Sequence, residues 1–203
     1  MKIIVVGATG TIGKAVVAEL GQRHEVVRVG NKSGDVRLDI TSSESIEAMY
    51  QQVGSFDALV SATGSVHFGP LADITPAEWS LGLDSKLMGQ VNLVLLGMKH
   101  ITDGGSFTLT TGILADEPIR YGTSASMVNR ALEGFVMGAA VEMPRNIRLN
   151  VVSPTVIQES LENYGPYFRG FDAVTAAKAA LGYAKSVEGL RTGAVIKVNG
   201  QVG

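Results

Sequence analysis

Three glycines at a fixed spacing follow the first apolar run of the chain, and they constrain its fold more than any other feature. The run Ile3–Val6 ends at Gly7, and Gly10 and Gly13 follow in the pattern G-x-x-G-x-x-G. A short apolar run bounded by glycine is typical of a strand buried on both faces. Helical spacing begins at Ile12, so the glycines join a strand to a helix. The pattern predicts the first strand–loop–helix unit of a parallel sheet.

Apolar runs and helical segments alternate along the rest of the chain. We expect strands at 25–29, 36–38, 58–60, 106–110, 147–152 and 194–198, and helices at 42–53, 75–98 with a break near Gly82, 124–143 and 172–186. The four residues 31–34 are too few for a crossover helix, so the third strand is either a short edge strand or irregular. The prediction is an α/β fold of one domain over 1–203, a doubly wound, Rossmann-like parallel sheet in three layers (α/β/α), with the helix between strands two and three missing.

Composition excludes several classes of protein. The 203 residues carry 17 Lys and Arg against 19 Asp and Glu, which argues against a protein that binds nucleic acid by neutralising phosphates. The chain has no cysteine, which excludes disulfides, thiol nucleophiles and cysteine-bound metals. Its three histidines have no ligand-like spacing, so we expect no metal. We also expect a cytoplasmic protein, because no apolar run approaches the roughly 20 residues of a membrane span and the N-terminal run is too short for a signal peptide.

The glycine loop predicts a nucleotide site. Its first glycine allows a tight turn, its second lets the backbone approach a pyrophosphate, and its third lets the helix pack on the strand. Exposed amides and the helix dipole then favour an anion. The alternative is a tight strand–helix turn that binds nothing, and the alternating α/β context favours the nucleotide.

The end of the second strand indicates which nicotinamide cofactor would bind. The segment 28–33 reads Arg-Val-Gly-Asn-Lys-Ser, with no Asp or Glu at the usual position for a ribose 2′-hydroxyl. Lys32, Ser33, and also Arg28 or Asn31, are candidates to hold a 2′-phosphate instead. We therefore expect NADP, with NAD less favoured, although Lys32 alone could be a solvated turn residue.

Further segments extend this pattern in a fixed order. They are 38–41 (Leu-Asp-Ile-Thr), 61–64 (Ser-Ala-Thr-Gly), Trp79, 106–111, 131–135 (Ala-Leu-Glu-Gly-Phe), 146–154 and 192–200. Together with the glycine loop they make the chain resemble the short-chain dehydrogenase/reductases along nearly its whole length. The resemblance implies an NAD(P)-dependent oxidoreductase that acts on a carbonyl or an alcohol. The cofactor-binding residues that we expect are Gly7, Thr9, Gly10, Thr11, Ile12, Gly13, Asn31, Lys32, Ser33, Asp39, Ile40, Ala62, Thr63, Gly64, Pro154 and Val156.

The catalytic residues of the family are mostly replaced here. In the family a Tyr moves the proton, a Lys four residues later lowers the pKa of that Tyr, a Ser polarises the carbonyl and an Asn anchors a proton relay. Matched to this sequence, the Tyr and Lys positions hold Ala125 and Asn129, the Ser position holds Thr111, and the Asn position falls near Lys86. We therefore expect the fold and the cofactor site of the family, with an altered catalytic site.

Three side chains are candidates for the missing proton donor. Lys86 and Asn129 exchange the family's Asn and Lys, so a cation could still reach the site, unless Lys86 is simply an exposed helix lysine. Tyr121 lies four residues before Ala125, about one helical turn away, but Pro118 and Gly122 suggest that the helix begins after it. His67 follows the fourth strand and has a suitable pKa, although such a loop histidine is commonplace. The candidate catalytic residues are Thr111, Tyr121, Lys86 and Asn129.

Two apolar features suggest partners. Tyr164, Tyr167, Phe168 and Phe171 follow Pro154, where they either line a substrate pocket or pack the loop onto the sheet. The helix 124–143 is apolar nearly all round, so one side should face the sheet and the other a second copy, in a homodimer or homotetramer.

The leading function is NADP(H)-dependent interconversion of a small-molecule carbonyl and its alcohol. The alternative is an NADPH-binding regulatory or sensor protein with little turnover, and a weaker one is a relative that modifies sugars.

Overall fold

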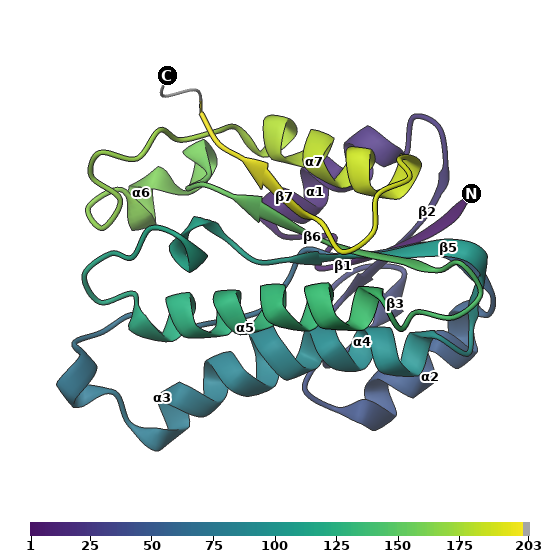
Figure 1. Ribbon diagram of the computed structural model, residues 1–203, viewed down its shortest axis with the longest axis horizontal. Coiled ribbons are helices and arrows are strands. Elements are labelled where there is room, and N and C mark those ends of the chain that lie inside the picture. The colour runs from purple at the N-terminus through teal and green to yellow at the C-terminus, as the bar shows by residue number, and fades with distance from the viewer. Residues whose placement is uncertain (201–203) are drawn as a thin grey trace.

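All seven strands of the computed structural model, which describes residues 1–200, pair in parallel in one sheet (Figure 1). Their order is β3-β2-β1-β4-β5-β6-β7, so the chain reverses its direction across the sheet between β1 and β4. The strands are β1 (Lys2–Val6), β2 (Glu25–Gly30), β3 (Val36–Arg37), β4 (Phe56–Ser61), β5 (Ile101–Thr110), β6 (Arg148–Pro154) and β7 (Val195–Val198). This is the doubly wound fold that the sequence predicts, and ligands of such folds bind at the carboxyl edge where the order reverses.

Helices cover both faces of the sheet (Figure 1). One face carries α1 (Thr11–Leu20) and α7 (Ala176–Glu188), and the other carries α2 (Ser43–Val53), α4 (Gln90–Gly97) and α5 (Thr123–Ala140). Side chains alternate between the faces: Ile3 and Val5 pack toward α1 and α7, whereas Ile4 and Val6 pack toward the other helices. The central strand β1 is apolar from Ile3 to Val6 because both of its faces are buried.

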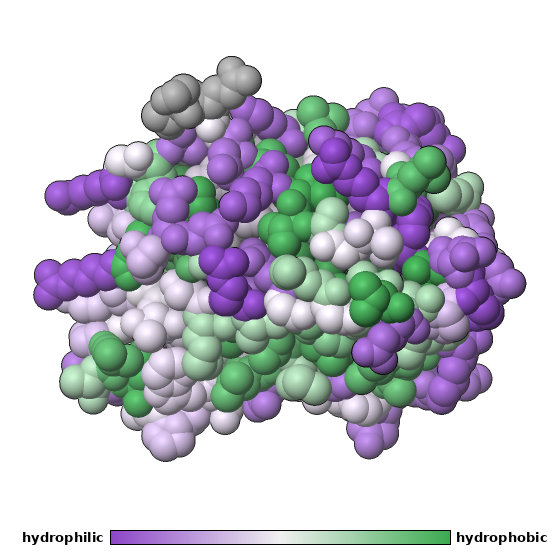
Figure 2. All heavy atoms as spheres, in the orientation of Figure 1, coloured by the Kyte–Doolittle hydropathy of each residue, from purple (hydrophilic) through white to green (hydrophobic). Residues whose placement is uncertain are grey.

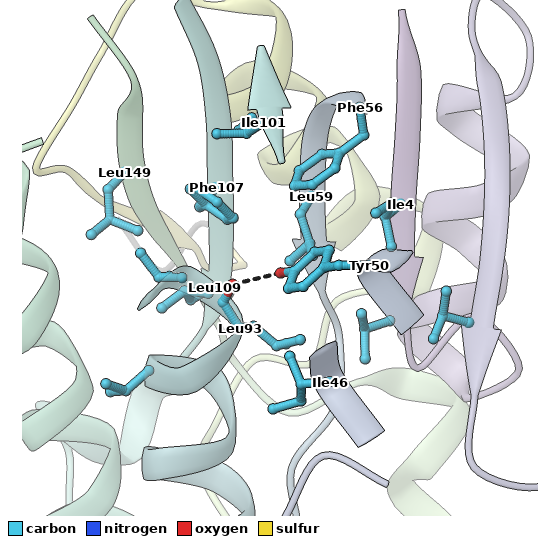
Figure 3. Packing of buried hydrophobic residues seen from close by; sticks show 14 of the residues in the cluster. Ile4, Ile46, Tyr50, Phe56, Leu59, Leu93, Ile101, Phe107, Leu109 and Leu149 are labelled. Atoms are coloured by element: carbon cyan, nitrogen blue, oxygen red, sulfur yellow. Dashed lines mark hydrogen bonds between the residues drawn. The ribbon is translucent and has the colours of Figure 1, made fainter. Parts of the chain in front are cut away.

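Aromatic rings fill the core between the sheet and the helices α2 and α4. Tyr50 is fully buried, stacks on Phe56 with ring centroids 5.5 Å apart, and donates a hydrogen bond of 2.5 Å to the carbonyl oxygen of Leu93 (Figure 3). Phe107 of β5 meets Phe56 edge to face at 6.1 Å. Burial raises the pKa of Tyr50 well above its usual value, so the phenol stays protonated. These contacts hold the sheet in place beneath the site.

The connection between β2 and β3 contains no helix, as the sequence predicts, and all of its residues are described. The chain doubles back after Gly30, and the amide of Asp35 donates to the carbonyl oxygen of Arg28 at 2.7 Å. Gly34 has φ +125°, a conformation that residues with side chains rarely adopt. After this turn β3 pairs with β2 over only two residues, so it is a short edge strand.

Several boundaries differ from those expected. The segment 75–98 consists of α3 (Pro76–Ser80), the π-helix η2 (Leu81–Gly89) and α4, so the expected break near Gly82 is a change of helix type. The last long helix begins at Ala176, since the Thr175 side chain accepts a hydrogen bond from the amide of Lys178. The remaining short helices are η1 (Leu71–Asp73), η3 (Ile113–Ala115), η4 (Gln158–Ser160) and α6 (Leu161–Tyr164). Within residues 1–200 no helix combines the length and the apolar character needed to cross a membrane.

Candidate active site

The glycine loop lies between the carboxyl end of β1 and the first turn of α1. Gly7 has φ +79°, and a Cβ atom there would lie 2.5 Å from the carbonyl oxygen of Ala62. A Cβ atom on Gly13 would lie 1.9 Å from the carbonyl oxygen of Gly7. A side chain at either position would force the loop or the helix away from the sheet. These close approaches explain the first and third glycines of the pattern.

The second glycine leaves the N-terminus of α1 open. Gly10 is the N-cap residue, and it has no side chain to accept hydrogen bonds from the first amides of the helix. A Cβ atom on Gly10 would meet only the carbonyl oxygen of Gly7, at 3.4 Å. Thr9, Gly10 and Thr11 are exposed. Open amides at the positive end of the helix dipole favour an anionic group in front of Gly10.

Two cavities flank this loop at the carboxyl edge of the sheet. The cavity toward β2, here the β2-side cavity, has a volume of about 290 Å³. The cavity toward β6, here the β6-side cavity, has a volume of about 230 Å³. The first is lined by residues that include Gly7, Gly30, Asn31, Asp39, Ile40 and Thr63, and the second by residues that include Ile12, Lys86, Thr111, Asn129, Pro154 and Val156. A cavity on each side of an anion-binding loop fits the two halves of a dinucleotide.

The β2-side cavity is lined by Asp39, one of the expected cofactor-binding residues. Asp39 accepts hydrogen bonds from the amide of Thr41 at 2.9 Å and from its hydroxyl at 2.7 Å. These bonds, first the hydroxyl and then the amide, lower the pKa of Asp39. The side chain is thus held as a carboxylate at the cavity wall, beside Ile40.

The turn after β2 carries the residues expected at a 2′-phosphate. Asn31, Lys32 and Ser33 are all exposed there. Arg28 is already engaged, since its Nη2 atom lies 2.6 Å from Oδ1 of Asp35 and the pair lowers the pKa of Asp35 to about 2. Of the two cations considered, Lys32 is therefore the one without a carboxylate partner among residues 1–200.

Lys86 extends from the π-helix η2 into the β6-side cavity. Gly64, with φ +119°, packs so closely that a Cβ atom there would lie 2.8 Å from the Cα atom of Lys86. The ε-amine lies 3.5 Å from the carbonyl oxygen of Thr111, a weak hydrogen bond, and no carboxylate within residues 1–200 pairs with it. Burial lowers the pKa of Lys86 to about 8. The amine is thus poised to lose or gain a proton near neutral pH, and it remains free to donate to a ligand.

Gln90, which sequence reasoning missed, fixes the position of this lysine. Its amide nitrogen donates to the carbonyl oxygen of Lys86 at 2.9 Å and to that of Thr110 at 3.0 Å. Its amide oxygen accepts from the amide of Thr110 at 2.9 Å. Gln90 is fully buried and therefore ties η2 to the end of β5. Its signal in the sequence is weak, because Gln90 is one of two amide side chains, with Asn92, at the start of a mostly apolar helical run.

Thr111 and Asn129 face the same cavity with different hydrogen-bonding states. The Thr111 hydroxyl donates to the main-chain oxygen of Asn129 at 3.0 Å, so its proton points away from the cavity. The side-chain oxygen of Asn129 is buried and has no partner among the described residues. A buried acceptor without a donor is costly, and a hydroxyl of a bound ribose would satisfy it.

The structure brings Ala125 to the cavity and leaves Tyr121 outside its lining. Ala125 is buried in the first turn of α5, so the cavity has no phenol where the family has one. Tyr121 precedes α5 in a loop, with φ +69°, and its ring lies 4.8 Å from the guanidinium carbon of Arg120. His67 is also outside the lining, and its Nδ1 atom lies 3.4 Å from Glu78. Among the described lining residues, Lys86 is therefore the one that carries a charge, and Tyr164 contributes the one phenol.

Part of the predicted aromatic cluster closes the mouth of the cavity. Tyr164 and Phe168 line it, together with Phe68 from the loop after β4. The rings of Phe68 and Tyr164 have centroids 5.8 Å apart. Tyr167 also approaches Phe68, at 6.3 Å, but it does not line the cavity. Phe171 packs edge to face on Phe168 at 5.3 Å, outside the lining.

Glu133 is a second residue that sequence reasoning missed. It is buried behind Thr111, with one carboxyl oxygen 3.4 Å from the Thr111 hydroxyl and the other 2.8 Å from Arg130. Burial raises the pKa of Glu133, while Arg130 opposes the rise. Arg130 also reaches Asp116, which Lys197 of β7 contacts at 2.7 Å. This chain of charges ties α5 to the loop after β5 and to β7.

In residues 1–200 we find no cluster of three metal-ligating side chains.

The parallel sheet and the glycine loop at its reversal point define a Rossmann-type protein. A family model described as Enoyl-(Acyl carrier protein) reductase matches residues 2–195. The chain belongs to the short-chain dehydrogenase/reductase family, as the resemblance in its sequence implies.

Curated relatives match most of this chain but extend beyond it. An uncharacterized oxidoreductase of Methylorubrum extorquens is 27% identical over 163 residues, which are 77% of this chain and 66% of the relative. A tetrahydroxynaphthalene reductase of Pyricularia oryzae is 27% identical over 183 residues, which are 78% of this chain and 65% of that protein. The chain thus spans just under two thirds of the length of these relatives.

Solved structures match over nearly the whole length. The protein lin1944 from Listeria innocua is 52% identical, with a TM-score of 0.96 over 98% of this chain and 99% of that one. A small-chain dehydrogenase in complex with NADPH has a TM-score of 0.88 over 98% of this chain and 96% of that one. The second is 24% identical, so it supports the fold alone.

Proposed function

We propose that this protein is an NADP(H)-dependent oxidoreductase that interconverts a small carbonyl compound and its alcohol. The observation that carries the proposal is Lys86, a partly buried amine without a carboxylate partner in residues 1–200, in one of two cavities that flank the glycine loop. Family membership and relatives with reductase names support it. A cytoplasmic location, where NADPH is abundant, is part of the proposal.

The residues around both cavities suit this cofactor. The amides at the start of α1 bind the pyrophosphate, and Asp39 borders the adenine. The unpartnered oxygen of Asn129 accepts a hydrogen bond from the ribose of the nicotinamide half. The exposed Lys32 and Ser33 hold the 2′-phosphate, for which NADP rather than NAD is the matching ligand. Bound NADPH supplies a hydride.

Lys86 moves the proton in this proposal. In the direction of reduction its ammonium group donates a proton to the substrate oxygen, and in the direction of oxidation the neutral amine accepts one. A pKa of about 8 allows both states near neutral pH. Gln90 holds η2 against β5 and so keeps Lys86 aimed at the cavity. Thr111 does not polarise the substrate, because its hydroxyl group donates its hydrogen bond to the main-chain oxygen of Asn129.

A comparison of Lys86→Met with the native protein tests the proposal. We expect calorimetry to show tight NADPH binding by both proteins. We expect the oxidation of NADPH with a panel of aldehydes and ketones to be about 10²–10⁴-fold slower in the variant, the usual value of a general acid. Lys178→Met changes an exposed lysine of α7 and is the control. Equal rates in the native protein and Lys86→Met would contradict the assigned role.

The second candidate is a protein that binds NADPH with little turnover. The observation that favours it is the buried Ala125 at the position of the family's phenol. The double substitution Ala125→Tyr with Asn129→Lys separates the candidates when it is made in the Lys86→Met background. If Lys86 is the acid, the new phenol and cation should recover at least tenfold of the lost rate. Tight NADPH binding without native turnover on any carbonyl would favour the second candidate.

Assembly through α5 is a further part of the proposal. Apolar side chains gather on the surface over α4 and α5 (Figure 2). Leu95, Met137 and Val141 are 46%, 61% and 86% exposed. A cavity of about 460 Å³ lies between these helices, lined by residues such as Phe135 and Met143. Such a face suits a homodimer or homotetramer built around paired copies of α4 and α5.

A further inference from the structure

The walls of the β6-side cavity are mostly apolar, and besides Lys86 their polar residues are Thr110, Thr111, Asn129, Thr155, Ser160 and Tyr164. Four separate segments of the chain contribute them: the loop after β4, η3, α5 and the segment from η4 to α6. The apolar walls include Phe68, Ile113, Leu114, Ile157, Tyr164 and Phe168. A ligand with many hydroxyl groups would place some of them against apolar side chains, and each unpaired buried polar group is costly. The walls therefore select against sugars and other polyhydroxylated carbonyl compounds.

Aromatic rings form one wall of the cavity. Phe68 and Tyr164 come from segments almost 100 residues apart, and their rings meet at an angle of 56° with centroids 5.8 Å apart. Tyr164 is 41% exposed, so it presents apolar ring surface at the mouth. A flat ring in the cavity would contact these faces in the offset or edge-to-face arrangements that aromatic pairs favour.

The charge in the cavity is confined to Lys86. No carboxylate belongs to the described lining, so a cationic ligand would meet an ammonium group without compensation. The Thr111 hydroxyl already donates a hydrogen bond to the main-chain oxygen of Asn129, and the side-chain oxygen of Asn129 is an acceptor. A ligand oxygen therefore finds its charged donor at Lys86, and the rest of the ligand meets a mostly apolar surface.

The volume limits the ligand to about one ring. The β6-side cavity measures about 230 Å³, which is below the roughly 300–1,000 Å³ of sites for drug-sized ligands. Under the proposed function the nicotinamide ring takes the part beside Ile12 and Pro154. What remains suits a single ring with a short substituent.

We propose that the substrate is a small, uncharged aromatic carbonyl compound, with its oxygen at Lys86 and its ring against Phe68 and Tyr164. This inference rests on the proposed function. In reduction the carbonyl carbon gains a hydride and the oxygen gains the proton of Lys86 as the carbon–oxygen double bond becomes single. The two electrons come from NADPH, which leaves as NADP⁺, and water returns a proton to the neutral Lys86.

The test compares four ligands of similar size by ligand-observed NMR in the presence of NADP⁺, which cannot reduce them. They are benzaldehyde, cyclohexanone, glyceraldehyde and benzoate. We expect benzaldehyde to bind most tightly and glyceraldehyde at least tenfold more weakly, as unpaired hydroxyl groups predict. Glyceraldehyde or cyclohexanone binding as tightly as benzaldehyde would overturn the aromatic assignment. Tighter binding of benzoate would overturn the requirement for an uncharged ligand.

Two tyrosines provide a matched pair of variants. Tyr164 and Tyr167 are 41% and 44% exposed, and both lie against Phe68, but only Tyr164 lines the cavity. Tyr164→Ala should weaken benzaldehyde binding about five- to tenfold, the value of one aromatic contact, while Tyr167→Ala should change it less than twofold. Equal effects of the two variants would contradict the predicted ring contact.

The proposed function and this inference can fail separately. Failure of NADP⁺ to bind would remove the proposed function, and benzaldehyde binding without cofactor would still decide whether the cavity takes an aromatic carbonyl. Rapid NADPH oxidation with glyceraldehyde but not with benzaldehyde would keep the proposed function and remove the inference.

Discussion

The ε-amine of Lys86 lies 3.5 Å from the main-chain oxygen of Thr111, in the cavity lined by the two positions that match the family's catalytic tyrosine and lysine. The two positions that supply that pair elsewhere hold Ala125 and Asn129, both buried in α5. The cation that lines this cavity is thus Lys86 of η2, whereas α5 has Asn129 at the position of the family's lysine.

The rate of carbonyl reduction should depend on the protonation of Lys86. The ammonium form donates the proton, so the rate should fall as the pH rises through about 8, the pKa to which burial lowers this amine. Oxidation of the alcohol needs the neutral amine and should rise through the same range. Profiles of kcat against pH in both directions measure this. An unchanged pH dependence in Lys86→Met would assign the titration to another group.

The substitution Lys86→Met should stabilise the cofactor-free protein by about 1 kcal/mol at pH 7. Folding at that pH moves a charged amine out of water, which is why its pKa falls from 10.5 to about 8. We expect less than the full value of that shift, because Lys86 is only partly buried. Above pH 8 the native amine is neutral when folded, so native stability recovers and the advantage of Met should shrink toward pH 10. Urea denaturation of both proteins at pH 7 and pH 10 measures the difference in their free energies of unfolding at each pH.

Gly10→Ala should weaken NADPH binding at least tenfold with little change in melting temperature. Its Cβ atom meets no close protein atom except the Gly7 oxygen at 3.4 Å, so it would occupy the space reserved for the pyrophosphate. Gly13→Val is the comparison, since a Cβ atom there would lie 1.9 Å from the Gly7 oxygen and must also disturb the packing of α1. Native-like NADPH affinity in Gly10→Ala would show that the glycine loop is a structural turn that does not bind the pyrophosphate.

Lys32→Asp should reverse or flatten a preference for NADPH over NADH. The substitution places a carboxylate beside the 2′-phosphate, where it repels that group and accepts from a 2′-hydroxyl. Calorimetry with both cofactors measures the ratio of affinities, and Lys178→Asp on α7 controls for net charge. Tighter binding of NADH by the native protein would show that the turn after β2 holds no phosphate.

Met137→Asp should dissociate the assembly that we propose around α4 and α5. Met137 is 61% exposed on α5, so its charge would enter the shared apolar face. Leu190→Asp is a matched control, because Leu190 is 93% exposed and lies beyond the end of α7. Sedimentation should give a dimer or tetramer for the native protein and the control. A native monomer at micromolar concentration would rule out this assembly.

The sequence by itself determined the strands, the order of the elements and the glycine loop. Buried parallel strands are apolar on both faces, so a continuous apolar run such as Ile3–Val6 predicts a strand without knowledge of the segments that pack against it. The missing helix before β3 was equally predictable, because four residues cannot form a crossover. The fold depends on such local patterns, and the sequence predicted it correctly.

Only the tertiary structure decided the chemical state of the site. Arg28 was a candidate to bind the 2′-phosphate, but the turn after β2 places Asp35 against its guanidinium group. Thr111 has the hydroxyl group expected at its position, but that hydroxyl donates a hydrogen bond to the main-chain oxygen of Asn129. Lys86 is the central residue of the proposed site because Gln90 ties η2 to β5 and because burial lowers the pKa of its amine. A pKa or a free donor depends on atoms that distant segments bring within a few ångströms, whereas strand and helix patterns are set by residues that are neighbours in the chain.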